Sequence, residues 1–167
     1  MVDGLNGLSE EDAGALLKQS CGATRWVKRM VEGSPYKDLP ALREAARTAW
    51  EKMERQDILE AFDHHPRIGA DIQALRKKFK STAALSESEQ SSVADASEQT
   101  LLALRDGNKK YEDRYGHIFI VCATGKSAQE MLELLEARMD NEPDHELQIA
   151  AAEQAKITQI RLENIQL

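Results

Sequence analysis

The amino-acid sequence predicts an all-α protein that forms a single compact multi-helix domain over residues 1–167. Apolar residues recur every three or four positions along most of the chain, as they do on the buried face of a helix. Helix-capping residues stand at the beginnings of these stretches, and Gly or Pro follows several of them. Residues 117–123 are the single strongly β-prone run, and the sequence offers them no partner strand. We therefore expect one short extended segment among helices, lining a pocket.

The composition is typical of an ordinary soluble globular protein. The residues are 41% hydrophobic and 31% charged, which is neither a disordered nor a membrane composition. The net charge of −7 argues against a nucleic-acid binder, because such proteins need a basic face. No apolar run reaches the ~18 residues of a membrane span, and no signal-peptide pattern opens the chain. The two cysteines show neither metal-type nor disulfide-type spacing. We expect a reduced, cytoplasmic protein.

Capping residues predict three helices in the first third of the chain. Ser9, with an acidic residue three positions later, resembles a capping box, and Cys21 with the following Gly ends that helix. Thr24 is expected to cap a shorter helix that stops at Gly33. Asp38 is expected to cap the third. Their inward faces are, in order, Ala13, Leu16 and Leu17; Trp26, Val27, Met30 and Val31; and Leu39, Leu42, Ala45, Ala46, Ala49, Trp50 and Met53.

A short helix with Ile58, Leu59 and Phe62 inward leads into the turn His64-His65-Pro66-Arg67-Ile68-Gly69. Pro66 restricts His65 to extended backbone angles and cannot continue a helix, and Gly69 can close the corner. A helix over residues 71–79 is expected next. A histidine on a stiff turn is well placed to face a pocket. The alternative is that His65 only bonds a neighbouring carbonyl.

The second half predicts three longer helices. Ser86 and Glu89 form a second capping-box pattern that opens helical sequence as far as Tyr115, with a possible interruption at Asp106-Gly107. Ser127 is expected to cap a helix that ends before Pro143, and Asp144 is expected to open the last helix. Arg161 lies on the apolar side of that helix. Its guanidinium either reaches solvent or is offered inward to an anion.

Two common motifs fail on inspection. Thr124-Gly125-Lys126-Ser127 lacks the earlier glycine of a phosphate-binding loop, because Ile120 stands in its place. A metal site is not expected either, since the adjacent His64 and His65 diverge and no ligand has the required spacing. Acid–base chemistry remains. His65 titrates near neutral pH, and Glu89 is either its carboxylate partner or a helix cap alone.

Several motifs, taken in their order and spacing, resemble those of the 2-oxo-4-hydroxy-4-carboxy-5-ureidoimidazoline (OHCU) decarboxylases. The resemblance covers nearly the whole chain and rests on His65-Pro66-Arg67-Ile68-Gly69, Glu89-Gln90, Asn108 to Ile120, Lys156-Ile157 and Arg161-Leu162, with Cys21 and Trp26 near the start. It departs at Ile118, where members often carry proline, and in a slightly short spacing between Glu89 and Asn108. It implies an all-helical homodimer without a cofactor, which converts OHCU to (S)-allantoin in the last step of urate degradation.

The resemblance also implies roles for individual residues. His65 matches the catalytic histidine and Glu89 its partner carboxylate. Phe119 to Ala123 match an extended segment whose backbone holds the substrate, and Arg161 matches an arginine that faces the pocket. The implied substrate-binding residues are Pro66, Ser86, Glu87, Ser88, Gln90, Phe119, Ile120, Val121, Cys122, Ala123 and Arg161.

The chemistry of such a substrate suits these residues. A ring C=N next to the carboxylate-bearing carbon can take the electrons released as CO2 leaves, so neither pyridoxal nor a metal is required. Positioning and proton transfer suffice. The alternatives are a non-catalytic helical protein-interaction module and a helical metal-dependent hydrolase. The interaction module would explain the amphipathic helices, but not the unpaired extended run or the histidine on a rigid turn.

Overall fold

The computed structural model describes residues 1–66, 73, 75 and 90–165. Every regular element in these ranges is a helix and none is a strand, which confirms the all-α class. The chain divides into two compact units, Met1–His65 with Ala151–Leu167, and Pro66–Ala150. The expectation of one domain stays a prediction. The helix expected at 71–79, apart from the helical residues Gln73 and Leu75, and the capping box at Ser86 and Glu89 lie outside the described residues.

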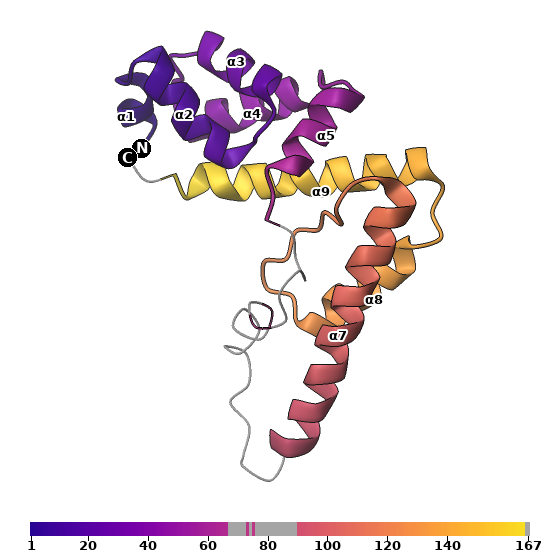
Figure 1. Ribbon diagram of the computed structural model, residues 1–167. Coiled ribbons are helices and arrows are strands. Elements are labelled where there is room, and N and C mark those ends of the chain that lie inside the picture. Colours follow the sequence, from indigo (N-terminus) through magenta and orange to yellow (C-terminus); the bar gives the residue numbers. More distant parts are fainter. Residues whose placement is uncertain (67–72, 74, 76–89, 166–167) are drawn as a thin grey trace. The chain divides into compact units, whose positions relative to one another are not determined.

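The first unit contains α1 (Val2–Asn6), α2 (Glu10–Ser20), α3 (Thr24–Glu32), α4 (Leu39–Trp50), α5 (Arg55–Asp63) and the C-terminal part of α9 (Pro143–Glu163) (Figure 1). Two predicted caps are confirmed. The Ser9 hydroxyl accepts a hydrogen bond from the N–H of Asp12 at 3.1 Å. The Asp38 carboxylate likewise accepts from the N–H of Ala41 at 2.9 Å.

The prediction that Thr24 caps α3 is wrong. Ala23 occupies the capping position without a side-chain hydrogen bond, and Thr24 is the first helical residue. Glu60 of α5 supplies the missing acceptor, since its carboxylate accepts from the Thr24 N–H at 3.0 Å and from the Thr24 hydroxyl at 2.5 Å. A carboxylate at a helix N-terminus is favourable for both hydrogen bonding and the helix dipole. A tertiary contact therefore replaces the expected local cap.

The core of the first unit forms where the predicted apolar faces meet. Trp26 is fully buried, and its indole N–H donates to the Ala46 carbonyl at 3.1 Å. Trp50 is partly buried and donates to the Ala151 carbonyl at 3.1 Å. Both indoles pack in the apolar core and satisfy their one donor, as core tryptophans usually do. The largest other buried side chains are Leu17, Met30, Leu42, Phe62 and Leu162.

The second unit is built on α7 (Gln90–Tyr115) and α8 (Ala128–Arg138), which pack side by side, and the first part of α9 (Figure 1). The predicted cap at Ser127 is confirmed, and it forms a capping box with Glu130. Gly107 does not interrupt α7. A Cβ there would lie 2.6 Å from Leu135 Cδ2, so this glycine allows α7 and α8 to approach closely. The last helix begins at Pro143 rather than Asp144, because proline fits the first helical turn.

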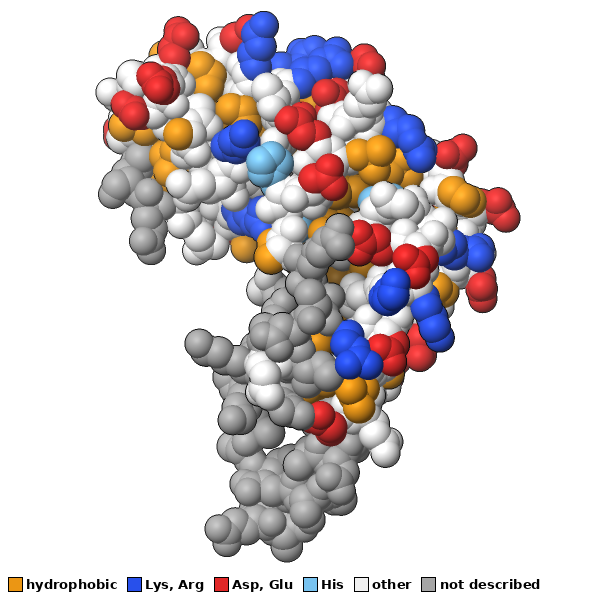
Figure 2. Space-filling model, in the orientation of Figure 1, with side chains coloured by type: hydrophobic (Ala, Val, Ile, Leu, Met, Phe, Trp, Pro, Cys, Tyr) orange, Lys and Arg blue, Asp and Glu red, His pale blue; other side chains and the backbone are white. Residues whose placement is uncertain are grey.

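Two further features complete the description. Within the ranges that the structure describes, no helix is long and apolar enough to cross a membrane. Basic and acidic side chains are interspersed over the described surface on the face drawn in Figure 2.

Candidate active site

His65 lies in the turn that follows α5. Helix α5 ends at Asp63, and the N–H of His65 donates to the Phe62 carbonyl at 3.0 Å. The turn packs against Gly22, where an added Cβ would lie 2.2 Å from ring atoms of His64. Only a glycine therefore allows the segment after α2 to pass this close to the turn. The close packing holds His65 where its half-buried imidazole meets α9.

The His65 ring is bound at both nitrogens by side chains of α9. Its Nε2 lies 2.5 Å from the amide oxygen of Gln154. Its Nδ1 lies 3.4 Å from Nη2 of Arg161. The other terminal nitrogen of Arg161, Nη1, lies 3.5 Å from the Gln19 carbonyl. Arg161 is thus half-buried, and its guanidinium is directed at the histidine. Its binding of an anion stays a prediction.

A buried polar chain continues behind the histidine. Gln154 is fully buried, and its amide nitrogen donates to the Thr158 hydroxyl at 3.1 Å. Thr158 is itself buried and acts on the pKa of the Cys21 thiol. Burial raises the pKa of the Cys21 thiol to about 11, although the bonds from Ala23 and Thr158 act in the opposite direction. Cys21 is therefore a neutral packing group at pH 7, because a reactive cysteine needs a lowered pKa.

The surroundings of His65 favour its neutral form. Burial lowers its pKa from the ordinary value, and the electrostatic effects of Arg161 and His64 lower the pKa further. The hydrogen bond with Gln154 acts in the opposite direction. A histidine with a lowered pKa is mostly unprotonated at pH 7. His65 is thus prepared to accept a proton next to a guanidinium that can bind an anion.

In the second unit, the extended segment Phe119 to Ala123 is held by side chains rather than by a partner strand. Nη1 of Arg138 donates to the Ile120 carbonyl at 2.8 Å, and Nζ of Lys126 donates to the Cys122 carbonyl at 2.8 Å. The guanidinium of Arg138 lies 4.5 Å from the centre of the Phe119 ring. Side chains therefore satisfy part of the backbone of this segment, where no partner strand is described.

The pair formed by Arg138 and Glu146 supports this segment. Both residues are buried, and Glu146 Oε1 accepts from Nε of Arg138 at 2.8 Å and from its Nη2 at 2.5 Å. The Tyr111 hydroxyl donates to the same carboxylate. Asn141 donates to Oε2 of Glu146 at 2.8 Å. A buried carboxylate with this many donors anchors the guanidinium that binds the Ile120 carbonyl.

The structure brings together some of the predicted site residues. His65 and Arg161 are in contact, and the exposed Pro66 follows His65 directly. Phe119 to Ala123 form one non-helical segment in the second unit. Gln90 is the first residue of α7, and its side chain is outside the description. Ser86, Glu87, Ser88 and Glu89 lie outside the described residues, so their roles stay predictions.

The sequence reasoning missed Gln154 and Thr158. Both are buried polar residues on α9, and with Arg161 they follow one another at the three- and four-residue spacing of one helix face. Their spacing on one helix face was the only sequence signal that they lie near Arg161. The spacing did not show that Gln154 is buried, because a glutamine on an amphipathic helix is usually exposed.

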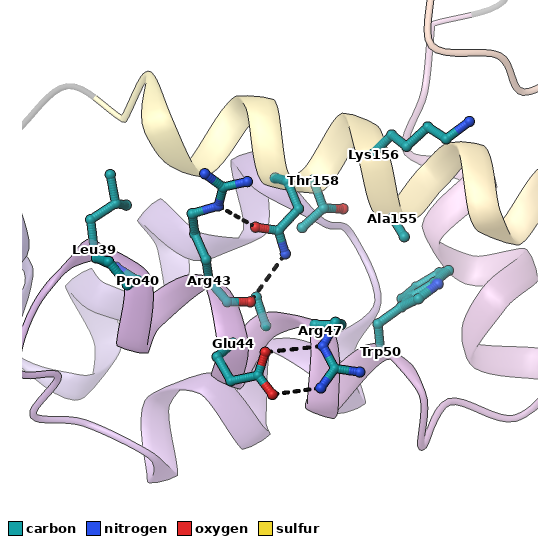
Figure 3. Close-up of a pocket in the computed structure, with 11 residues that line it drawn as sticks. Leu39, Pro40, Arg43, Glu44, Arg47, Trp50, Ala155, Lys156 and Thr158 are labelled. Carbon is teal, nitrogen blue, oxygen red and sulfur yellow. Dashed lines mark hydrogen bonds and ion pairs between the residues drawn. The ribbon is translucent and has the colours of Figure 1, made fainter.

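A separate groove of about 550 Å³ lies between α4 and α9 (Figure 3). Its cationic side chains are already paired. Arg43 donates to Gln159 at 2.9 Å and also bonds Glu163, and Arg47 bonds Glu44 and Glu51. Neither His65 nor Phe119 to Ala123 line this groove. We therefore do not include it in the candidate site.

Comparison with known proteins gives a consistent set of relatives. The family model described as OHCU decarboxylase matches residues 6–163. The uric acid degradation bifunctional protein TTL of Arabidopsis thaliana is 37% identical over 147 residues, which are 87% of this chain and 44% of that protein. The 2-oxo-4-hydroxy-4-carboxy-5-ureidoimidazoline decarboxylase of Amia calva is 41% identical over 58 residues, 35% of this chain and 33% of that protein. The chain thus spans less than half the length of these curated relatives.

Solved structures agree with these sequence relatives. A crystal structure of an OHCU decarboxylase in the presence of (S)-allantoin has a TM-score of 0.72 and 32% identity, covering 94% of this chain and 97% of that chain. The crystal structure of an (S)-allantoin synthase has a TM-score of 0.68 at 16% identity, covering 98% of this chain and 53% of that chain. The second likeness concerns the fold alone.

Proposed function

The chain belongs to the OHCU decarboxylase family, and from this premise we propose that it converts 2-oxo-4-hydroxy-4-carboxy-5-ureidoimidazoline to (S)-allantoin. The observation that carries the proposal is the family match over residues 6–163. The contact between His65 and Arg161 supports it, because it joins a proton-transfer group to a cation. The solved relative in the presence of (S)-allantoin supports the choice of product.

The reaction needs little beyond positioning and proton transfer. The bond between the ring carbon and the carboxylate breaks, and its electron pair moves toward the neighbouring C=N, whose nitrogen becomes protonated. The hydroxyl on the same carbon then loses its proton to become a carbonyl. The ureido-bearing carbon accepts a proton on one face, which sets the chirality. No external oxidant or reductant takes part, so we propose that the enzyme works without a cofactor or metal.

The proposed roles follow from charge and protonation. Arg161 binds and orients the substrate carboxylate, since a guanidinium matches a carboxylate with two parallel hydrogen bonds. The neutral imidazole of His65 accepts and returns protons during the reaction. Glu89 is proposed to orient the histidine and the substrate. The backbone of Phe119 to Ala123 is proposed to bind the ureido and ring atoms, together with Pro66 and the residues from Ser86 to Gln90.

Two properties accompany this proposal. The family resemblance supports a homodimer, and analytical ultracentrifugation of the purified protein would test it by its mass. The two free cysteines, Cys21 and Cys122, support a reducing compartment, and we propose that the protein lies in the cytoplasm. Fractionation of cells that produce the protein would test that location.

We expect the protein to accelerate the loss of OHCU generated from urate in situ. The product should be optically active (S)-allantoin, because a bound substrate is protonated on one face. Absorbance follows the loss of OHCU, and circular dichroism follows the chirality of the product. Racemic allantoin formed at the spontaneous rate would contradict the proposed function. Activity lost to a chelator and restored by zinc would contradict the cofactor-free mechanism alone.

Replacing Arg161 with lysine should lower kcat/KM by about 10- to 100-fold. A hydrogen bond to a charged group contributes about 1.5–3 kcal/mol, and a lysine ammonium cannot reproduce the planar, two-pronged geometry of the guanidinium. Steady-state kinetics of Arg161→Lys measure the effect. Arg43→Lys is the matched control, because Arg43 is an exposed arginine bonded to Gln159 and Glu163. Unchanged kinetics in Arg161→Lys would show that the guanidinium does not bind the substrate.

A further inference from the structure

We propose that Gln154 is a positioning residue that fixes the tautomer of His65, holding the ring proton on Nε2 and leaving the lone pair on Nδ1, beside Arg161. Gln154 is fully buried on α9 and lies 2.5 Å from Nε2 of His65 through its amide oxygen. The tautomer concerns the ligand-free protein. Its consequence for the reaction rests on the proposed decarboxylase function.

The orientation of the Gln154 amide follows from the groups that its two ends contact. Its nitrogen lies 3.1 Å from the Thr158 hydroxyl and donates to it. The amide oxygen therefore faces His65, 2.5 Å from Nε2. Arg161 fixes the same orientation independently, because a guanidinium can only donate to Nδ1 and so leaves Nε2 to donate to an acceptor.

The imidazole of His65 lies between two partners that fix its protonation state. A carbonyl oxygen only accepts hydrogen bonds, so Nε2 must carry a proton to bond Gln154. A guanidinium only donates, so Nδ1 must offer its lone pair to Arg161, 3.4 Å away. Both partners require the same neutral tautomer. The donors then run in one direction, from Arg161 through His65 and Gln154 to Thr158.

The arrangement has a consequence for the proposed reaction. The nitrogen of His65 that accepts a proton is Nδ1, because Nε2 is already protonated and covered by a buried amide. Nδ1 is also the nitrogen that lies beside Arg161, the cation proposed to hold the substrate carboxylate. Gln154 therefore directs the basic nitrogen to the substrate without touching the substrate itself. This is the role that a partner behind a catalytic imidazole usually has.

Imidazole ¹⁵N NMR of the ligand-free protein tests the tautomer directly. Long-range correlation spectra distinguish the protonated from the unprotonated ring nitrogen, and His65→Ala identifies the His65 signals. The native protein should show the Nε2–H form. Gln154→Met, of similar volume but without an acceptor, should give a mixture of tautomers. Thr158→Val should give a partial change, because it frees the amide to turn.

Two further variants sharpen the test. Gln154→Glu keeps an acceptor at the same place, so it should retain the Nε2–H form, while its negative charge raises the pKa of His65 above that of the native protein. Gln159→Met is the matched control, since Gln159 lies on the same helix but bonds Arg43. It should change neither the tautomer nor the pKa of His65.

The kinetic expectation follows from the same geometry. Gln154→Met should lower kcat by about 10- to 100-fold, the loss typical of removing the partner that orients a functional histidine, with little change in KM. Gln154→Glu should be less affected in kcat at a pH above the raised pKa of His65. A purely structural role would instead lower stability alone and leave the tautomer of the folded protein unchanged.

The outcomes separate this inference from the proposed function. An Nδ1–H form in the native protein would overturn it, as would a Gln154→Met protein that keeps the native tautomer. If Gln154→Met fails to fold, the isosteric Gln154→Glu decides, and an unchanged pKa of His65 in that variant would contradict the contact. A native protein that shows the Nε2–H form but does not act on OHCU would contradict the proposed function while the tautomer stands.

Discussion

His65→Ala should lower the rate of OHCU decarboxylation by about 10²–10⁴-fold, the usual contribution of a positioned acid–base group, and leave the protein folded. The imidazole is half-buried and does not belong to the apolar core. The turn keeps its close packing with Gly22 and its hydrogen bond to Phe62. The cost to stability should stay within about 1–3 kcal/mol, because one buried carbonyl, that of Gln154, loses its partner.

The control for this prediction is an exposed histidine outside the turn. His145 lies in the first turn of α9 and is exposed, so the His145→Ala variant should have close to the native rate. Initial rates and melting temperatures measured on the same preparations separate catalysis from stability. Native turnover in His65→Ala, with the whole effect in the melting temperature, would show that His65 is only structural.

The pH dependence gives a second measurement of the same residue. The pKa of His65 is lowered by burial first and then by Arg161 and His64, so the neutral form persists to a pH below the ordinary histidine value of about 6.5. A reaction that needs neutral His65 should keep its rate at pH 7 and lose it only below about pH 6.5. This acid limb should be absent from the residual activity of His65→Ala.

Local signals in the sequence were sufficient for most of the helices. The starts of α2, α4 and α8 were predicted because Ser9, Asp38 and Ser127 cap their own helices with bonds three residues away. The start of α3 was mistaken in its cap, because the acceptor comes from Glu60, 36 residues further along the chain. Gly107 was predicted as a possible break in α7 because its packing partner is distant in the sequence. The structure shows that the missing side chain lets Leu135 of α8 approach α7 closely.

Residues of the candidate site could be predicted where the residue type and the local sequence pattern were sufficient to indicate them. His65 was indicated by the turn around Pro66, and Arg161 by its place on an apolar helix face. Gln154 was not indicated, because its burial depends on His65, 89 residues earlier in the chain. Arg138 resembled an ordinary cation in the last turn of a helix. Its bond to the Ile120 carbonyl is visible only once the second unit has folded.

The buried pair of Arg138 and Glu146 should give the largest loss of stability. Glu146→Gln keeps the shape of the side chain but removes its charge, which leaves the guanidinium of Arg138 buried without a counter-charge. Breaking such a pair from one side typically costs about 3–5 kcal/mol of unfolding free energy. Chemical denaturation of the native and variant proteins measures the difference. Asp113→Asn in the exposed pair with Lys109 is the control, with an expected change of about 0–1 kcal/mol.

The same variant should also affect the extended segment that Arg138 holds. Arg138 donates to the Ile120 carbonyl, so a guanidinium that has lost its anchor should let the segment from Phe119 to Ala123 move, and KM should rise in the protein that remains folded. Replacing both partners with apolar residues, as in Arg138→Met with Glu146→Leu, should cost less stability than the sum of the single variants, since no charge is left buried alone. The double variant should nevertheless keep the raised KM, because the Ile120 carbonyl still lacks its donor. A double variant with native KM would show that the bond from Arg138 does not position the segment.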